Sequence, residues 1–161
     1  MKTLVLGLGN PIVSDDSVGL RVAAELRTHL AGNAEIEVDE DYWGGLKLME
    51  RMIGYDRAIV IDAIQTGEAP GTIRQLRPDD LPTQRSASAH DANLATALAL
   101  GRQAGMHLPR DEAVVLVAIE AADILNFSEE LTPEVAASVP RAVALVLDIL
   151  AVPGTVTEES Q

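Results

Sequence analysis

The 161-residue chain contains no cysteine, and its aromatic residues are one tryptophan, one phenylalanine and two tyrosines. Without thiols it can form no disulfide framework, no thiolate nucleophile and no cysteine-ligated zinc site. Carboxylates, imidazoles and hydroxyls are the groups left for chemistry. Because the chain is 47% hydrophobic but only 2% aromatic, the core must be aliphatic, and recognition by aromatic stacking is disfavoured.

Basic residues are also scarce, with 12 Lys and Arg against 25 Asp and Glu and a formal net charge of -13. Proteins that bind nucleic acids neutralise phosphates with Lys and Arg, so this balance disfavours nucleic acid and anionic membranes as partners. No apolar run approaches the roughly 20 residues of a membrane span. Gly7, Gly9 and Asn10 interrupt the first apolar run, which excludes a signal peptide there. We expect a cytoplasmic monomer.

The length predicts one α/β domain over residues 1–152, followed by a polar tail at 153–161. Strand patterns alternate with helix patterns, which predicts a three-layer sandwich: a twisted, mostly parallel sheet of about five strands with helices on both faces. Strands are expected from Leu4 and over 34–38, 57–62, 72–76 and 112–119, with 72–76 exposed and antiparallel to its neighbour; helices are expected over 18–30, 46–53, from about 88–90 to 104, and 132–150. Pro140 should bend the last helix, and 77–89 should be a loop.

Residues 4–16, LVLGLGNPIVSDD, combine a buried strand with an abrupt stop. Glycines and a proline end the strand, and a Ser-Asp-Asp sequence opens the next helix. The strand therefore delivers Asp15 and Asp16 to one place. One interpretation is that both acids only complement the positive end of the helix dipole.

The start of this stretch partly matches two other motifs. A dinucleotide fingerprint would need a third glycine where Ile12 stands, and Asp15 and Asp16 would repel a pyrophosphate. GLGNP also opens the peptidyl-tRNA hydrolases, but the Tyr and the His-Asn pair expected soon afterwards are absent, and the chain is acidic. Neither match predicts the function.

Two strands that end on acids suggest a metal site. In a doubly wound sheet the first and third strands are neighbours, so Asp16 and Asp62 should face each other across the switch point, and His90 could reach the same rim. Two carboxylates and an imidazole around an open position suit a divalent transition metal. Taken singly, Asp62 could cap a turn and His90 could be a surface residue. Their joint occurrence predicts a metal site.

Four motifs connect the chain with a known family. They are GLGNPIVSDDSVG at 7–19, AIVIDAI with the following PGTI at 58–73, SASAH at 86–90, and LTPEV at 131–135 with the later Pro140. With these motifs, the chain resembles the hydrogenase maturation endopeptidases from Met1 to about Leu150. These proteases trim the C-terminus of the large subunit of nickel-iron hydrogenases.

The resemblance implies that Asp16, Asp62 and His90 form the catalytic, metal-binding site. It also implies that they hold no permanent metal cofactor, but engage the nickel already installed in the large-subunit precursor, so that cleavage follows nickel insertion. The metal would polarise the scissile carbonyl and activate a water, with a carboxylate accepting the proton. A non-catalytic nickel chaperone with the same three residues is the alternative function; a nucleotide-binding regulator is a third.

The chain departs from the better-known family members in two turns. Many have an Asp-Gly-Gly-Thr-x-Gly turn after the second strand, where this chain has EDYWGG at 40–45, and Ala121 replaces the usual proline of a Glu-Pro-Glu turn. The first difference leaves open which hydrogenase subunit is the partner. Trp43 and the 77–89 loop are expected to grip the tail of the substrate.

Overall fold

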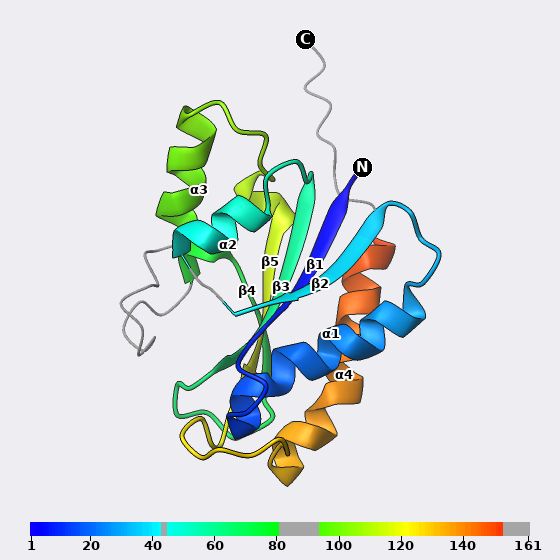
Figure 1. The fold of residues 1–161 in the computed structure, drawn as a ribbon, viewed down its shortest axis with the longest axis vertical. Helices are drawn as coiled ribbons and strands as arrows, with labels where there is room; N and C mark the ends of the chain where they lie inside the picture. Colours follow the sequence, from blue (N-terminus) through cyan, green and yellow to red (C-terminus); the bar gives the residue numbers. More distant parts are fainter. Residues whose placement is uncertain (43–44, 81–93, 153–161) are drawn as a thin grey trace.

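The computed structural model describes residues 1–42, 45–80 and 94–152. The strands are β1 (Thr3–Leu8), β2 (Ile36–Asp41), β3 (Arg57–Ile64), β4 (Ile73–Leu76) and β5 (Val114–Glu120). The helices are α1 (Val18–His29), α2 (Gly45–Arg51), α3 (Leu94–Gln103) and α4 (Pro133–Ala151), with short 3-10 turns η1 (Ser14–Ser17), η2 (Pro78–Asp80) and η3 (Asp111–Ala113) (Figure 1).

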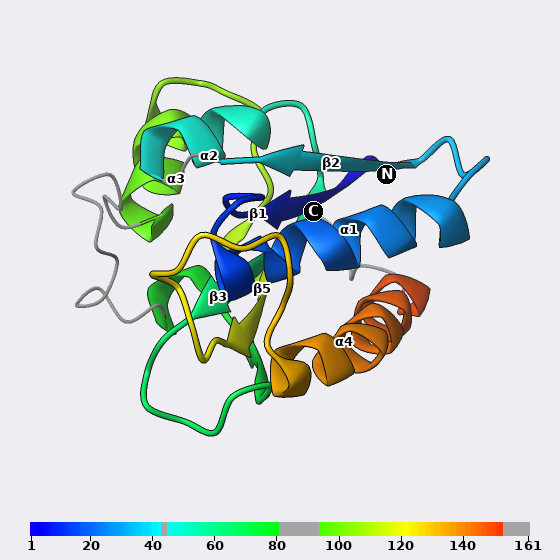
Figure 2. The same ribbon diagram turned by 60° about the horizontal axis from the view of Figure 1, so that its bottom comes forward.

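The strands form one sheet in the order β2-β1-β3-β5-β4, in which only β4 runs antiparallel to its neighbour. Helices α1 and α4 cover one face, and α2 and α3 cover the other (Figure 2). The predicted sandwich, the pairing of β1 with β3 and the antiparallel strand near residue 72 are therefore confirmed.

The central strands supply side chains to both core layers. Leu4 and Leu6 of β1 pack in the layer under α2 and α3, whereas Val5 packs in the layer under α1 and α4. In β3, Ile59 and Ile61 point to the α1 and α4 layer. A strand buried on both faces favours apolar residues at successive positions, which is why β1 after Thr3 is a run of Leu and Val with one glycine.

Strand β2 extends further than the sequence indicated. The expected strand ended at Val38, but the observed strand continues to Asp41, so the prediction of a turn beginning at Glu40 was wrong. The parallel ladder with β1 holds these acidic residues, because Leu8 pairs with Asp41 and the N–H of Gly9 donates to the Asp41 carbonyl at 3.2 Å. Backbone pairing outweighs the low strand propensity of Asp.

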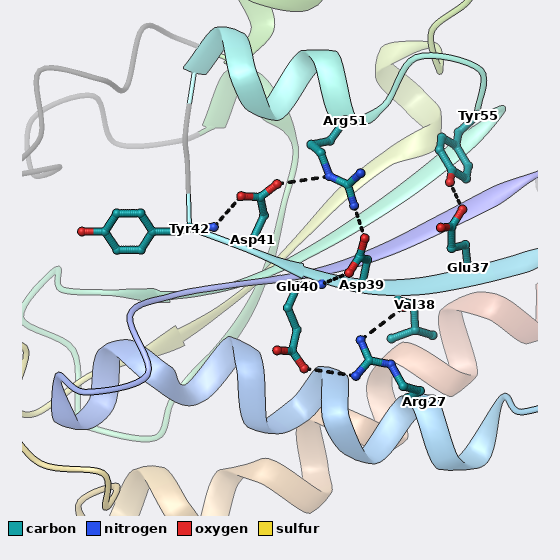
Figure 3. Close-up of polar contacts among 9 residues, drawn as sticks. All are labelled: Arg27, Glu37, Val38, Asp39, Glu40, Asp41, Tyr42, Arg51 and Tyr55. Atoms are coloured by element: carbon teal, nitrogen blue, oxygen red, sulfur yellow. Dashed lines mark hydrogen bonds and ion pairs between the residues drawn. The ribbon is translucent and has the colours of Figure 1, made fainter.

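Side chains along β2 add to this pairing (Figure 3). Arg51 of α2 contacts the carboxylates of both Asp39 and Asp41, with Nε 3.1 Å from Asp41 Oδ2. The Tyr55 hydroxyl donates to Glu37, and its burial and this contact raise the pKa of Tyr55 to about 12. Three acids of this edge strand are thus bound to α2 and to the segment that follows it, whereas Glu40 pairs with Arg27 of α1.

The remaining boundaries follow the sequence closely. Thr132 is the N-cap residue of α4 and Pro140 lies inside this helix, as predicted, while the bend at Pro140 stays a prediction. The loop expected at 77–89 opens with η2. The expected start of the third helix and the polar tail at 153–161 lie outside the described residues. Among the helices that the structure describes, none combines the length and apolar character of a membrane span.

Helix α1 begins in direct contact with the carboxyl ends of two strands. A Cβ on Gly19 would lie 2.3 Å from the carbonyl oxygen of Ile61 and 2.5 Å from that of Leu8. One at Gly9, where φ is +153°, would lie 2.1 Å from the Asp16 carbonyl oxygen. Because there is no room for a side chain at either position, glycine sets how close η1 and α1 come to β1 and β3.

We expect Gly19→Ala to lower the free energy of unfolding by about 2 kcal/mol. The added methyl group would meet two backbone oxygens, and this overpacking exceeds the roughly 1 kcal/mol by which alanine favours a helix over glycine. Urea unfolding followed by circular dichroism measures the change. Ala24→Ser, at an exposed position of the same helix, is the control. A Gly19→Ala protein as stable as wild type would contradict the packing described here.

Candidate functional site

Asp16 lies in η1, at the rim formed by the carboxyl ends of the strands. It is half-buried, and its Oδ2 accepts a hydrogen bond from the backbone N–H of Asn10 at 2.9 Å. Burial raises the pKa of Asp16 above its ordinary value of 3.8, and the hydrogen bond from Asn10 acts in the opposite direction. None of the residues that the structure describes pairs a base with Asp16, and a partly desolvated acid of this kind is typical of functional sites.

Asp62 lies near the carboxyl end of β3. The parallel register pairs Gly7 with Ile61, so Asp62 is level with the last residue of β1. Its Oδ1 accepts a hydrogen bond from the N–H of Ala63 at 2.8 Å, and the side chain is partly exposed. By strand alternation Asp62 shares the face of Val60, which is the face covered by α2 and α3.

The fold brings these two acids to one junction. Turn η1 contacts β3, and the start of α1 rests on the carbonyl of Ile61, the residue before Asp62. Asp16 thus follows β1, and Asp62 lies at the end of the neighbouring strand β3. That the two carboxylates face each other across this junction stays a prediction. This junction is the switch point of the sheet, where ligands bind in open α/β folds.

His90, the third predicted ligand, lies outside the described residues. The first described residue of α3 is Leu94, and α3 lies on the same face of the sheet as Asp62. Within residues 1–42, 45–80 and 94–152, no three His, Asp or Glu side chains are grouped so that they could hold a metal ion. Any third protein ligand beside Asp16 and Asp62 would lie outside these ranges, where the sequence predicts His90.

Asp15 has a different role from its neighbour. It is fully buried, and its carboxylate accepts hydrogen bonds from the N–H groups of Ala122 and Asp123 at 2.8 and 2.9 Å. It also accepts from the N–H and the hydroxyl of Thr132, both at 2.8 Å. Asp15 thus ties η1 to the loop after β5 and to the first residues of α4. These hydrogen bonds give Asp15 a role in the fold beyond the helix-dipole interaction considered from the sequence.

Sequence reasoning also missed the buried acid at the end of β5. Glu120 accepts hydrogen bonds from the N–H and hydroxyl of Thr66, at 2.6 and 2.9 Å, and from the N–H of Gly67 at 2.9 Å. Its signal in the sequence was the same as that of Asp62, an acid at the end of an apolar run. These bonds fix the loop between β3 and β4 along the same rim.

The described hydroxyls and imidazoles offer no nucleophile-base pair at this rim. The hydroxyl of Ser14 donates to the Glu130 carbonyl, and that of Ser17 donates to the carbonyl of Ser14. His107 lies 2.9 Å from Asp56, which directly precedes β3 and so lies at the amino ends of the strands, opposite the rim. The chemistry of the described rim is that of carboxylates.

Comparison with known proteins decides the family. The family model described as hydrogenase maturation protease matches residues 20–149. The chain belongs to the hydrogenase maturation protease family. This match covers α1 through most of α4 and includes Asp62 and His90.

Individual relatives support the same assignment. The hydrogenase 2 maturation protease of Escherichia coli K12 is 31% identical, with 93% of this chain and 91% of the relative covered. HupD of Thiocapsa roseopersicina, a hydrogenase expression/formation protein, is 25% identical over 99% of this chain and 72% of its own. The structure of the maturating endopeptidase HybD of E. coli matches with a TM-score of 0.77 and 30% identity, covering 94% of this chain and 93% of HybD. The protease fold and the enzyme class expected from the sequence are confirmed.

In this hydrogenase maturation protease, we expect Asp15→Ala to lower the free energy of unfolding by about 3 kcal/mol or more. The substitution would leave the donors of Ala122, Asp123 and Thr132 without their buried acceptor. Thermal and urea unfolding measure the loss, with the exposed Asp79→Ala as control. A loss no larger than that of the control would show that the hydrogen bonds accepted by Asp15 do not stabilise the fold.

Asp16→Asn should stabilise the metal-free protein at neutral pH, by roughly 1–2 °C in unfolding temperature. A raised pKa in the folded state means that folding favours the protonated acid, so the ionised form opposes folding as pH rises. The advantage of Asn should therefore vanish below the ordinary Asp value of 3.8 and grow to a plateau above the raised pKa. Scanning calorimetry between about pH 3 and 8 tests this, and a lower unfolding temperature of Asp16→Asn at neutral pH would refute it.

Proposed function

We propose that this protease removes the C-terminal extension of a nickel-iron hydrogenase large-subunit precursor after nickel has been inserted. In this proposal Asp16, Asp62 and His90 bind the nickel that the substrate carries. The main support is that Asp16 and Asp62, which come from different parts of the chain, lie at one switch point in a member of the hydrogenase maturation protease family. The nickel is part of the substrate, so the enzyme needs no metal of its own.

These side chains suit that task chemically. Carboxylate oxygens and an imidazole nitrogen can occupy part of the coordination sphere of a divalent ion and leave a position for a carbonyl oxygen or a water. An ion held there polarises the scissile carbonyl and lowers the pKa of a bound water. The water oxygen attacks the carbonyl carbon, a carboxylate accepts its proton, and the proton passes to the leaving amine as the peptide bond breaks. A precursor without nickel would lack both the Lewis acid that polarises the carbonyl and the ion that the three side chains bind.

The specific partner is also a matter of proposal. Strand β2 ends at Asp41, level with the end of β1, so the chain leaves the sheet at Tyr42 on the same rim as Asp16. We infer that the residues that follow β2 contribute to the choice of the large subunit. Trp43 and His90 lie outside the described residues, as does most of the loop predicted to grip the substrate tail. The monomeric state and the cytoplasmic location remain predictions.

Incubation of nickel-loaded precursor with the wild-type protein should give a shorter product, seen by intact-mass spectrometry, whereas nickel-free precursor should stay uncut. Asp16→Ala, Asp62→Ala and His90→Ala should each lower the cleavage rate about 100-fold or more, as expected for loss of a metal ligand or a proton acceptor.

Matched controls show whether a loss of cleavage is specific to the three site residues or follows from replacing any Asp or His. Asp148→Ala and His29→Ala, at exposed positions away from the rim and outside the 77–89 loop, should cleave at the wild-type rate. Cleavage at the wild-type rate by Asp16→Ala or His90→Ala would overturn the assignment. A precursor of unchanged length that co-elutes with the protein only when nickel is present would indicate the chaperone function.

A further inference from the structure

Three large apolar side chains are exposed on the two loops next to Asp16. Ile12 is 49% exposed, Leu125 is 84% exposed and Phe127, the only phenylalanine in the chain, is 82% exposed. Single exposed apolar residues are common, but a group on adjoining loops marks an interaction surface. We call these three residues the apolar rim patch.

The two loops that carry the patch are joined by backbone hydrogen bonds. The N–H of Ser128 donates to the Ile12 carbonyl at 3.0 Å, and the N–H of Ser14 donates to the Ser128 carbonyl at 2.9 Å. The Asp15 N–H donates to the Asp123 carbonyl at 2.9 Å, in addition to the carboxylate bonds described above. Figure 2 shows the loop after β5, in yellow and gold, passing beside the blue segment that enters α1.

The exposed tip of the second loop has its own fixed turn. The Asp123 carboxylate accepts hydrogen bonds from the N–H groups of Leu125 and Asn126 at 3.0 Å and from the Asn126 side chain at 2.8 Å. This turn fixes the backbone at Leu125 and Asn126, directly before Phe127. A preformed surface loses little conformational entropy on binding.

The patch is continuous with the candidate site and is flanked by acids. The N–H of Asp16 donates to the Val13 carbonyl at 2.9 Å, and Val13 is bridged to Ser128. The loop at 121–131 contains Asp123, Glu129 and Glu130 but no lysine or arginine. Arg21 of α1 is the basic neighbour, and its guanidinium donates to the Glu129 carbonyl. An apolar surface with an acidic border suits an apolar partner segment that carries basic residues at its edge.

We propose that the apolar rim patch docks an apolar segment, flanked by basic residues, of the hydrogenase precursor beside its cleavage site. This inference rests on the proposed function, because it names the surface by which the same substrate is held. The patch supplies affinity and orientation, and Asp16 and Asp62 supply the chemistry. A substrate that is held at the patch as well as at the metal keeps its scissile bond at the reacting centre.

The test compares precursor cleavage by Leu125→Ser, Phe127→Ser and wild type over a range of nickel-loaded precursor concentrations. Each variant should raise the concentration for half-maximal rate about tenfold or more, the effect of losing a buried apolar anchor, while the rate at saturation stays the same. Leu100→Ser is the matched control, because Leu100 is 54% exposed on α3 and so lies over the other face of the sheet. It should behave as wild type. Unfolding temperatures confirm that each variant is folded.

Glu129→Lys combined with Glu130→Lys tests the acidic border. It should raise the half-saturating concentration most strongly at low salt, since exposed charges are screened at high salt. An unchanged half-saturating concentration would contradict the proposal that basic residues flank the docked segment.

The outcomes separate this inference from the proposed function. Failure of the wild type to cleave would overturn both. Normal cleavage with unchanged half-saturation in Leu125→Ser and Phe127→Ser, or a loss confined to the rate at saturation, would overturn the docking surface and leave the protease function intact. A wild-type dimer in light scattering that Phe127→Ser converts to a monomer would assign the patch to a second copy of the chain and also overturn the inference.

Discussion

The start of α1 lies directly on the carboxyl ends of β1 and β3, with glycine at the closest points. A side chain at Gly19 would meet the carbonyls of Leu8 and Ile61, and one at Gly9 would meet the carbonyl of Asp16. Because glycine has no side chain at these two positions, η1 can lie directly above the junction of the two strands. These close approaches, together with the hydrogen bonds of Asp15, position Asp16 above the ends of β1 and β3.

Two neighbouring acids then take opposite roles at this junction. Asp15 is fully buried and satisfied by donors from the loop after β5 and from Thr132, so its charge stabilises the fold. Asp16 is partly desolvated, and among the described residues its donor is the backbone N–H of Asn10, so burial raises its pKa and its charge does not stabilise the fold. Burying this charge lowers the stability of the fold, which is expected where a carboxylate acts on a substrate. The clamp made by Asp15 is what keeps Asp16 at the rim.

The sequence predicted the features that depend on local pattern. Continuous apolar runs identified β1, β3 and β5, and the crossover rules placed β1 beside β3, which brought Asp16 and Asp62 to one edge. The sequence did not predict features that depend on contacts between residues far apart in the chain. The extension of β2 to Asp41 depends on its ladder with β1, and the burial of Asp15 depends on Thr132, more than 100 residues away. No local pattern reveals such pairings.

The central claim is that two strand-end acids and one histidine meet at a single metal-binding point. Crystals of the whole protein soaked with a divalent nickel salt, with diffraction recorded at the nickel absorption edge, test it most directly. The account predicts one anomalous peak at the rim, with oxygens of Asp16 and Asp62 and a ring nitrogen of His90 each about 2 Å away. A nickel ion bound at another place, or a His90 imidazole directed away from both carboxylates, would contradict it.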